Sequence, residues 1–210
     1  MAINNQPVDR TTAWADALAL MQLIDAARSE KWVIAGSIRR MEPVVSDVDH
    51  VLIPRFGDVA GEDMFATPQR VNLLWHRLDE LIADPQSGLT KAVRSDGKTC
   101  YGERQRAVQF RGLKHEFYIA EPDTWGVQLT VRTGPADLGR HLVTVIKDRG
   151  YECRNGFQVY PIGRKAPIAV RDEEEFFRLC GVRYVSPPDR RALIEAIQRA
   201  AQAHRAGVLR

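Results

Sequence analysis

The sequence predicts an α+β fold, in which a small mixed sheet with helices on one face is followed by a smaller α+β subdomain. Two observations carry this prediction. Up to about residue 120, segments with helical apolar spacing alternate with short apolar runs that end at glycine or proline. Beyond that point the pattern changes to helices around one hairpin-like stretch, and 210 residues are enough for two small domains.

The first part of the chain is expected to begin with a helix and to end with a hairpin. Thr11 or Thr12 is the expected N-cap of the first helix, and the turn RGLK joins the last two strands. The expected elements are a helix at 12–28, strands at 31–36 and 47–54, a loop at 55–66, a helix at 68–83, and strands near 90–94, at 104–110 and at 113–120.

The second part is expected to be mostly helical. Gly150 is typical of a helix C-terminus and should end the first of these helices. The expected elements are a helix at 135–150, a hairpin-like stretch at 151–170, a short helix at 173–181 and, after the break SPPDR, a terminal helix at 190–204.

Composition indicates a globular protein and excludes a membrane-spanning one. Hydrophobic residues make up 44% and charged residues 27% of the chain, and no apolar stretch reaches the length of a membrane span. The net charge is only +3, but arginine dominates the basic residues and suits phosphate oxygens. The three cysteines lie far apart and the N-terminus lacks a signal-peptide pattern, so a reducing cytoplasm is the expected compartment.

Two aspartates open the expected strand at 47–54. Asp47 and Asp49 are one residue apart, so alternation along a strand places both on the same face. Side-by-side carboxylates repel each other unless a cation lies between them, and hard oxygen ligands suit Mg²⁺ or Mn²⁺. By the same alternation His50, and His115 in the later strand, should point to the opposite face.

A basic segment precedes the aspartates. Gly36 permits a tight turn with close backbone approach, Ser37 can donate a hydroxyl group, and Arg40 can bind a phosphate with two parallel hydrogen bonds. The expected arrangement is a nucleoside triphosphate between this segment and metal ions held by the aspartates. Arg190 and Arg191, at the start of the terminal helix, are expected to be solvated.

With these motifs the chain resembles the family X DNA polymerases, which are polymerase-beta-like nucleotidyltransferases. G-S-x-R-R, six residues and then D-x-D match the signature of that family. Later segments also match it in order, over roughly residues 30–190: HEFY at 115–118, in which Glu116 falls on the third metal-binding carboxylate, VRTG at 131–134, GYECRN at 150–155 and RYVSPPDR at 183–190.

The resemblance implies a template-directed DNA polymerase that adds deoxynucleotides to a primer 3′-hydroxyl by a two-metal mechanism, as in short-gap filling during DNA repair or replication. Its partners would be primer-template or gapped DNA and nucleoside triphosphates, and its cofactor would be Mg²⁺ or Mn²⁺. It would be a monomer that does not associate with membranes. The implied domains are a catalytic palm at 1–130, a nucleotide-binding subdomain at 131–189 and a terminal helix at 190–210.

The resemblance assigns roles to individual residues. Asp47 and Asp49 would bridge both metal ions, and Glu116 would bind the ion that activates the 3′-hydroxyl. The substrate-binding residues would be Gly36, Ser37, Arg40, Arg132, Thr133 and Gly134.

Three features depart from the family pattern. Glu116 replaces aspartate, Val131 and Arg132 replace an aromatic pair, and little precedes the palm. The layout therefore resembles that of the minimal viral polymerases of this family, which implies the cytoplasm of a host cell as the location. Two other functions remain open: a template-independent nucleotidyltransferase acting on another hydroxyl group, and an inactive DNA-binding module. If Glu116 is not the third carboxylate, Glu121 and Asp123 are the next candidates.

Overall fold

The computed structural model describes residues 6–59, 67–154 and 157–205. The chain divides into two compact units, of which the first comprises Met1–Ile34 and Pro43–Ala120 and the second comprises Ala35–Glu42 and Glu121–Arg210. The division falls earlier than the boundary predicted at residue 130. Parts of several sequence predictions lie outside the described residues, namely 1–5 of the expected palm, 60–66 of the expected loop, 155–156 of the hairpin-like stretch, which include Asn155 of the GYECRN segment, and 206–210 of the terminal segment.

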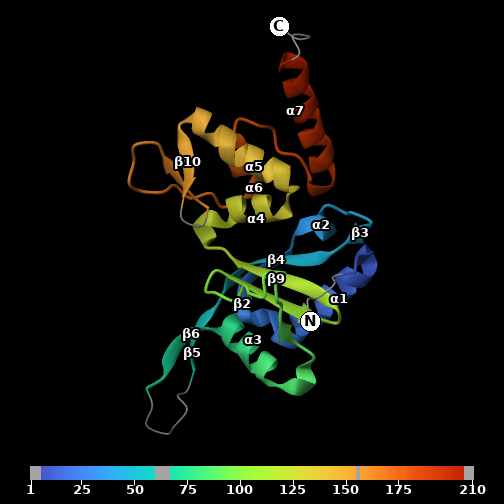
Figure 1. Cartoon of the computed structure of the whole chain (residues 1–210). Coiled ribbons are helices and arrows are strands. Elements are labelled where there is room, and N and C mark those ends of the chain that lie inside the picture. The colour runs from blue at the N-terminus through green and yellow to red at the C-terminus, as the bar shows by residue number, and fades with distance from the viewer. Residues whose placement is uncertain (1–5, 60–66, 155–156, 206–210) are drawn as a thin grey trace. The chain divides into compact units, whose positions relative to one another are not determined.

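The first unit is built around a five-stranded mixed sheet (Figure 1). The only parallel pair within this sheet is β4 with β9, and the other neighbours are antiparallel. In spatial order the strands are β2 (Ser29–Ile34), β4 (Asp47–Pro54), β9 (Leu113–Ile119), β8 (Gln105–Phe110) and β7 (Thr90–Lys91). The predicted mixed sheet is confirmed, and β4 spans the same residues as the strand expected from the sequence.

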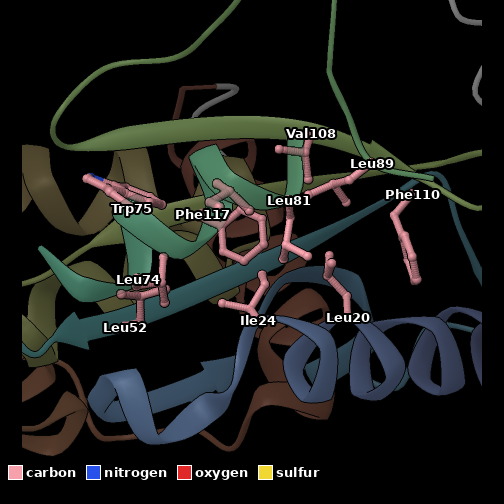
Figure 2. Packing of buried hydrophobic residues seen from close by; sticks show 11 residues of the cluster. Leu20, Ile24, Leu52, Leu74, Trp75, Leu81, Leu89, Val108, Phe110 and Phe117 are labelled. Carbon is pink, nitrogen blue, oxygen red and sulfur yellow. The ribbon is translucent and has the colours of Figure 1, made fainter. Parts of the chain in front are cut away.

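Two helices, α1 (Arg10–Ile24) and α3 (Leu73–Ala83), pack on one face of this sheet, as predicted. Phe117 of β9 lies at the centre of their shared core, as Figure 2 shows. The other buried members are Leu20, Ile24, Leu52, Leu74, Trp75, Leu78, Leu81, Leu89, Val108 and Phe110. Burying this much apolar surface is what holds the helices to the sheet.

Helix boundaries in the first unit differ from the prediction because of side-chain caps. The carboxylate of Asp9, not a threonine, caps α1 by accepting the backbone N–H of Thr12 at 3.0 Å, and Asp25, with φ of 72°, ends this helix before residue 28. Asn72 caps α3 by accepting the N–H groups of Leu74 and Trp75. Such caps satisfy backbone donors that no helical partner reaches.

Two short antiparallel pairs complete the first unit. They are β1 (Val8–Asp9) with β3 (Val44–Val45), and β5 (Phe56–Val59) with β6 (Gln69–Asn72). The predicted loop at 55–66 was therefore wrong for residues 56–59, and the predicted helix at 68–83 was wrong for its first residues, which form β6. The strand expected at 90–94 is confined to the two residues of β7.

The second unit is mainly helical, with one small hairpin. The sequence did not predict α4, which ends at Gly134 (φ of 67°), and the segment read as a VRTG turn is its last part. The elements are α2 (Gly36–Arg39), α4 (Trp125–Thr133), α5 (Ala136–Val145), β10 (Tyr151–Arg154), β11 (Gln158–Pro161), α6 (Glu173–Leu179) and α7 (Arg190–Arg205).

The other elements predicted for the second unit are present. A 3₁₀ turn at Ile146–Arg149 follows α5 and ends at Gly150 in the left-handed conformation, as predicted, and β10 pairs with β11 in the expected hairpin. The core of this unit consists of Val127, Leu138, Leu142, Ile146, Val159, Val170, Phe176, Phe177, Cys180 and Ile194. None of the described helices is both long enough and apolar enough to span a membrane.

Two phenylalanines of the first unit provide a matched test of this core. Phe117 has no exposed surface, whereas Phe56 of β5 is 54% exposed. We expect Phe117→Ala to lower the free energy of unfolding by about 3–5 kcal/mol, because it leaves a cavity, and Phe56→Ala to change it by less than about 1 kcal/mol. Urea denaturation followed by circular dichroism measures both, and equal losses would contradict the assigned core.

Candidate functional site

Three carboxylates lie on one face of the central strand pair. In the parallel register, Asp49 of β4 is opposite Glu116 of β9, and Asp47 is opposite Lys114. Alternation along both strands then directs Asp47, Asp49 and Glu116 to the face away from α1 and α3. All three are partly buried. The pairing of β4 with β9 thus places the three residues predicted as metal ligands on one face of the sheet.

The opposite face of the same two strands is buried and holds the histidines. His50 and His115 have no exposed surface, and their Nε2 and Nδ1 atoms are 3.0 Å apart. The indole N–H of Trp32 donates to Nδ1 of His50 at 3.0 Å. The ring of His50 also stacks on Phe117. The prediction that both histidines point away from the carboxylates is confirmed.

Burial keeps this histidine pair neutral. It lowers the pKa of His115 to about 3, and burial, together with the neighbouring His115, holds the pKa of His50 well below its usual value. The free energy needed to remove a charged imidazolium from water exceeds what its interactions with these neighbours contribute. The neutral form is therefore the one that packs in the core.

Lys114 brings a positive charge to the carboxylate face. Its Nζ atom lies 3.1 Å from Oδ2 of Asp47 and 3.4 Å from Oε1 of Glu116. Partial burial alone would lower the pKa of Lys114, but the carboxylates of Glu116 and Asp47 outweigh it and raise the pKa above its usual value. Lys114 is therefore charged at neutral pH. The sequence analysis missed it, although its position two residues before Glu116 puts it on the same face.

A tyrosine holds the other oxygen of Glu116. The hydroxyl group of Tyr118 donates to Oε2 of Glu116 at 2.8 Å, and this tyrosine is only 4% exposed. Beside this carboxylate there is a pocket of about 370 Å³, lined by residues that include Cys100, Gln105, Ala107, Lys114 and Glu116. Glu116 therefore forms part of the wall of this pocket.

The basic segment belongs to the second unit, where it forms α2. Gly36 has φ of 61°, a conformation that favours glycine, and Ser37 is partly buried. Nη1 of Arg40 donates to the backbone carbonyl oxygen of Thr133, and its Nε donates to Glu42 at 3.4 Å. Arg40 is thus held in place by its own chain.

Two of the predicted residues at the end of α4, Thr133 and Gly134, lie beside Arg40. A Cβ atom at Gly134 would lie 3.2 Å from Nη1 of Arg40, so the glycine allows a close approach. Thr133 is fully buried, with its hydroxyl group accepting a hydrogen bond from Arg39 at 2.7 Å. The guanidinium of Arg132 lies 5.7 Å from the ring centre of Phe157.

The second unit also contains a buried ion-pair network that the sequence analysis missed. Arg39 binds Glu173 with two hydrogen bonds, of 2.9 and 2.7 Å, and Nη2 of Arg190 donates to the same carboxylate at 2.9 Å. Arg190 has no exposed surface, so the expectation that it is solvated was wrong. Arg191 does remain exposed, and it pairs with Glu42. A buried arginine at the first position of a helix leaves no trace in apolar periodicity.

The alternative third carboxylates lie in the other unit. Glu121 and Asp123 both follow Ala120, and Oδ1 of Asp123 accepts a hydrogen bond from Nε of Arg171 at 3.2 Å. Across the described ranges, no three His, Cys, Asp or Glu side chains lie close enough together to hold a metal ion. The carboxylate face instead contains the ammonium group of Lys114.

The whole fold is similar to that of polymerase beta from Leishmania infantum. The ternary P/T complex of that protein gives a TM-score of 0.64 with 16% sequence identity, over 90% of this chain and 78% of that chain. Its ternary gap complex gives 0.65 with 15% identity, over 89% and 71%. The predicted polymerase-beta-like fold is therefore confirmed. The sequence matches no protein-family model and no curated protein.

The histidine pair makes folding stability depend on pH. Histidine in an unfolded chain has a pKa of about 6.5. Below that value the unfolded chain binds protons that the buried pair does not. The contribution of the pair to the free energy of unfolding is therefore fully present above about pH 6.5 and falls as the pH drops towards the pKa values of the histidines in the folded protein. We expect a loss of roughly 1.4 kcal/mol per neutral histidine between about pH 7.5 and 5.5. Urea denaturation at both values measures it, with the exposed His204→Gln as a control that keeps the full loss.

The buried network predicts a large effect of one neutral substitution. Glu173→Gln removes the charge that compensates Arg39 and Arg190, and we expect it to lower the free energy of unfolding by about 3–5 kcal/mol. Glu174→Gln, at an exposed neighbouring position of α6, is the matched control and should change it by less than about 1 kcal/mol. Thermal and urea unfolding measure the stability of both variants. Equal stabilities would show that the ion-pair network does not contribute to the stability of the fold.

Proposed function

We propose that this protein is a template-directed DNA polymerase, a nucleotidyltransferase that adds deoxynucleotides to the 3′-hydroxyl group of a primer. The observation that carries the proposal is the placement of Asp47, Asp49 and Glu116 on one face of paired strands in a polymerase-beta-like fold. Short-gap filling in DNA repair or replication, in the cytoplasm, is the role that this activity suits. The two solved neighbours are ternary complexes of a polymerase beta, which supports DNA and a nucleotide as partners.

The chemistry of the three carboxylates suits a hard divalent cation such as Mg²⁺ or Mn²⁺, although among the described residues they do not form a cluster close enough to hold one as they stand. Three carboxylates offer oxygen donors, and their charge exceeds the single positive charge of Lys114. We propose that Asp47 and Asp49 each contribute to both ion positions and that Glu116 contributes to one. Bound metal would act as a Lewis acid on the α-phosphate and lower the pKa of the attacking hydroxyl group.

The residues of the chain contribute binding, orientation and proton transfer. Glu116 lines the pocket beside the carboxylate face, where it can accept the proton of the 3′-hydroxyl group. Ser37 and Arg40, with the backbone at Gly36, are proposed to bind the β- and γ-phosphates of the nucleotide. Thr133 and Gly134 fix the position of Arg40, because it donates to the one and packs against the other. Arg132 is proposed to contact the nucleotide from the same helix end.

An extension assay tests the function. The protein is incubated with labelled primer alone, with primer-template or with gapped duplex, each with deoxynucleotides and Mg²⁺ or Mn²⁺. Extension that needs a template supports the proposal. Extension of primer alone would instead indicate a template-independent nucleotidyltransferase, and binding of DNA without extension would indicate an inactive DNA-binding module.

One substitution tests the carboxylate assignment. Asp49→Asn replaces a negatively charged ligand by a neutral amide, and we expect incorporation to fall at least ~10³-fold, equivalent to about 4 kcal/mol of transition-state stabilisation, with the fold intact. Asp58→Asn, in the exposed part of β5, is the matched control and should keep the parental rate. Primer extension and circular dichroism measure the two properties, and an Asp49→Asn rate within tenfold of the parent contradicts the assignment.

A further inference from the structure

Lys114 bridges two of the proposed metal ligands across neighbouring strands. Asp47 is on β4 and Glu116 on β9, and one ammonium group contacts a carboxylate oxygen of each, at 3.1 and 3.4 Å. The register explains this geometry, since Lys114 is directly opposite Asp47 and precedes Glu116 by two residues on the same face. The lysine therefore occupies oxygen atoms that a divalent cation would also need.

The carboxylate of Glu116 has a partner on each oxygen. Lys114 contacts Oε1 and the hydroxyl group of Tyr118 donates to Oε2. These partners come from positions two residues before and two residues after Glu116, so one strand supplies both. Tyr118 is nearly fully buried and can stay in place, whereas Lys114 has a flexible four-carbon stem and is partly exposed. Of the two partners, only Lys114 can move away from the carboxylate of Glu116.

Resting on the proposed function, we propose that Lys114 is a positioning residue of the metal site. Its ammonium group holds Asp47 and Glu116 together in the metal-free protein, and it leaves these oxygens when a divalent cation binds them. The lysine thereby prevents the repulsion that would separate like charges on adjacent strands. It also competes with the cation, because both need the same lone pairs.

Competition gives a prediction opposite to that of a purely structural role. If the lysine only supported the strand through packing, its loss would loosen the site and weaken metal binding. If it competes, a neutral side chain of similar length leaves the negative charge uncompensated. We therefore expect Lys114→Met and Lys114→Gln to bind Mn²⁺ about tenfold more tightly than the parent, and Lys114→Arg to bind it no more tightly than the parent.

The experiment measures Mn²⁺ binding to the full chain by electron paramagnetic resonance of the free ion, without nucleotide or DNA. Lys98→Met is the matched control, because it removes one exposed positive charge of the same unit from a position outside the carboxylate face; it should change the affinity by less than about twofold. Thermal unfolding with and without Mn²⁺ is the second readout. The Lys114→Met protein should be less stable than the parent without metal and should gain more stability from it.

The outcomes separate this inference from the proposed function. Tighter binding by both neutral variants supports the inference, and unchanged or weaker binding by both overturns it. Asp49→Asn is measured in parallel, and its loss of Mn²⁺ affinity supports the metal site itself. If Asp49→Asn binds Mn²⁺ as tightly as the parent, the proposed metal site fails regardless of what the lysine variants do.

Discussion

The parallel pairing of β4 with β9 is the constraint on which the first unit depends. One register sets Asp49 beside Glu116 and Asp47 beside Lys114 on one face, and it sets His50 beside Phe117 on the other. A shift by a single residue would turn the carboxylates into the core and the aromatic rings into solvent. The core on one face of the sheet therefore fixes the geometry of the charged face on the other, because residues of the same two paired strands point alternately to both faces.

The second unit is organised by charge in its interior. Glu173 accepts hydrogen bonds from Arg39 of α2 and from Arg190 at the start of α7, so it connects segments that are remote in the sequence. Arg40 is fixed nearby through the carbonyl oxygen of Thr133. A buried carboxylate shared by two arginines costs desolvation, which the three hydrogen bonds that Arg39 and Arg190 donate to Glu173 offset. The neighbouring arginines of the motif thus have different partners: Arg39 binds the buried carboxylate of Glu173, and Arg40 donates to the carbonyl oxygen of Thr133.

Local patterns predicted much of this fold, and long-range pairing accounts for what they missed. The bounds of β4 and the orientation of His50 and His115 follow from alternation and from the proline that ends the strand. The helix α4 was missed because VRTG was taken as a turn, and β6 because its residues continue a helical pattern into α3. Lys114 and Arg190 could not be assigned roles, since their partners Asp47 and Glu173 are identified only by the tertiary structure. Alternation predicted that Asp47 and Asp49 share a face, the resemblance added Glu116, and the strand register gives this grouping a physical basis.

The second unit is not continuous in the sequence, because Ala35–Glu42 belongs to it while the residues on both sides belong to the first unit. This limits how the protein can be dissected. A fragment that starts at Glu121 would lack Arg39 and Arg40, which leaves Glu173 with one arginine and Thr133 with none. Conversely, in a fragment that ends at Ala120, Arg39 would lose its acceptors Thr133 and Glu173, and Arg40 would lose the carbonyl oxygen of Thr133. The two units therefore cannot be exchanged between proteins as simple cassettes, and any chimaera has to transfer the eight-residue segment together with the C-terminal part.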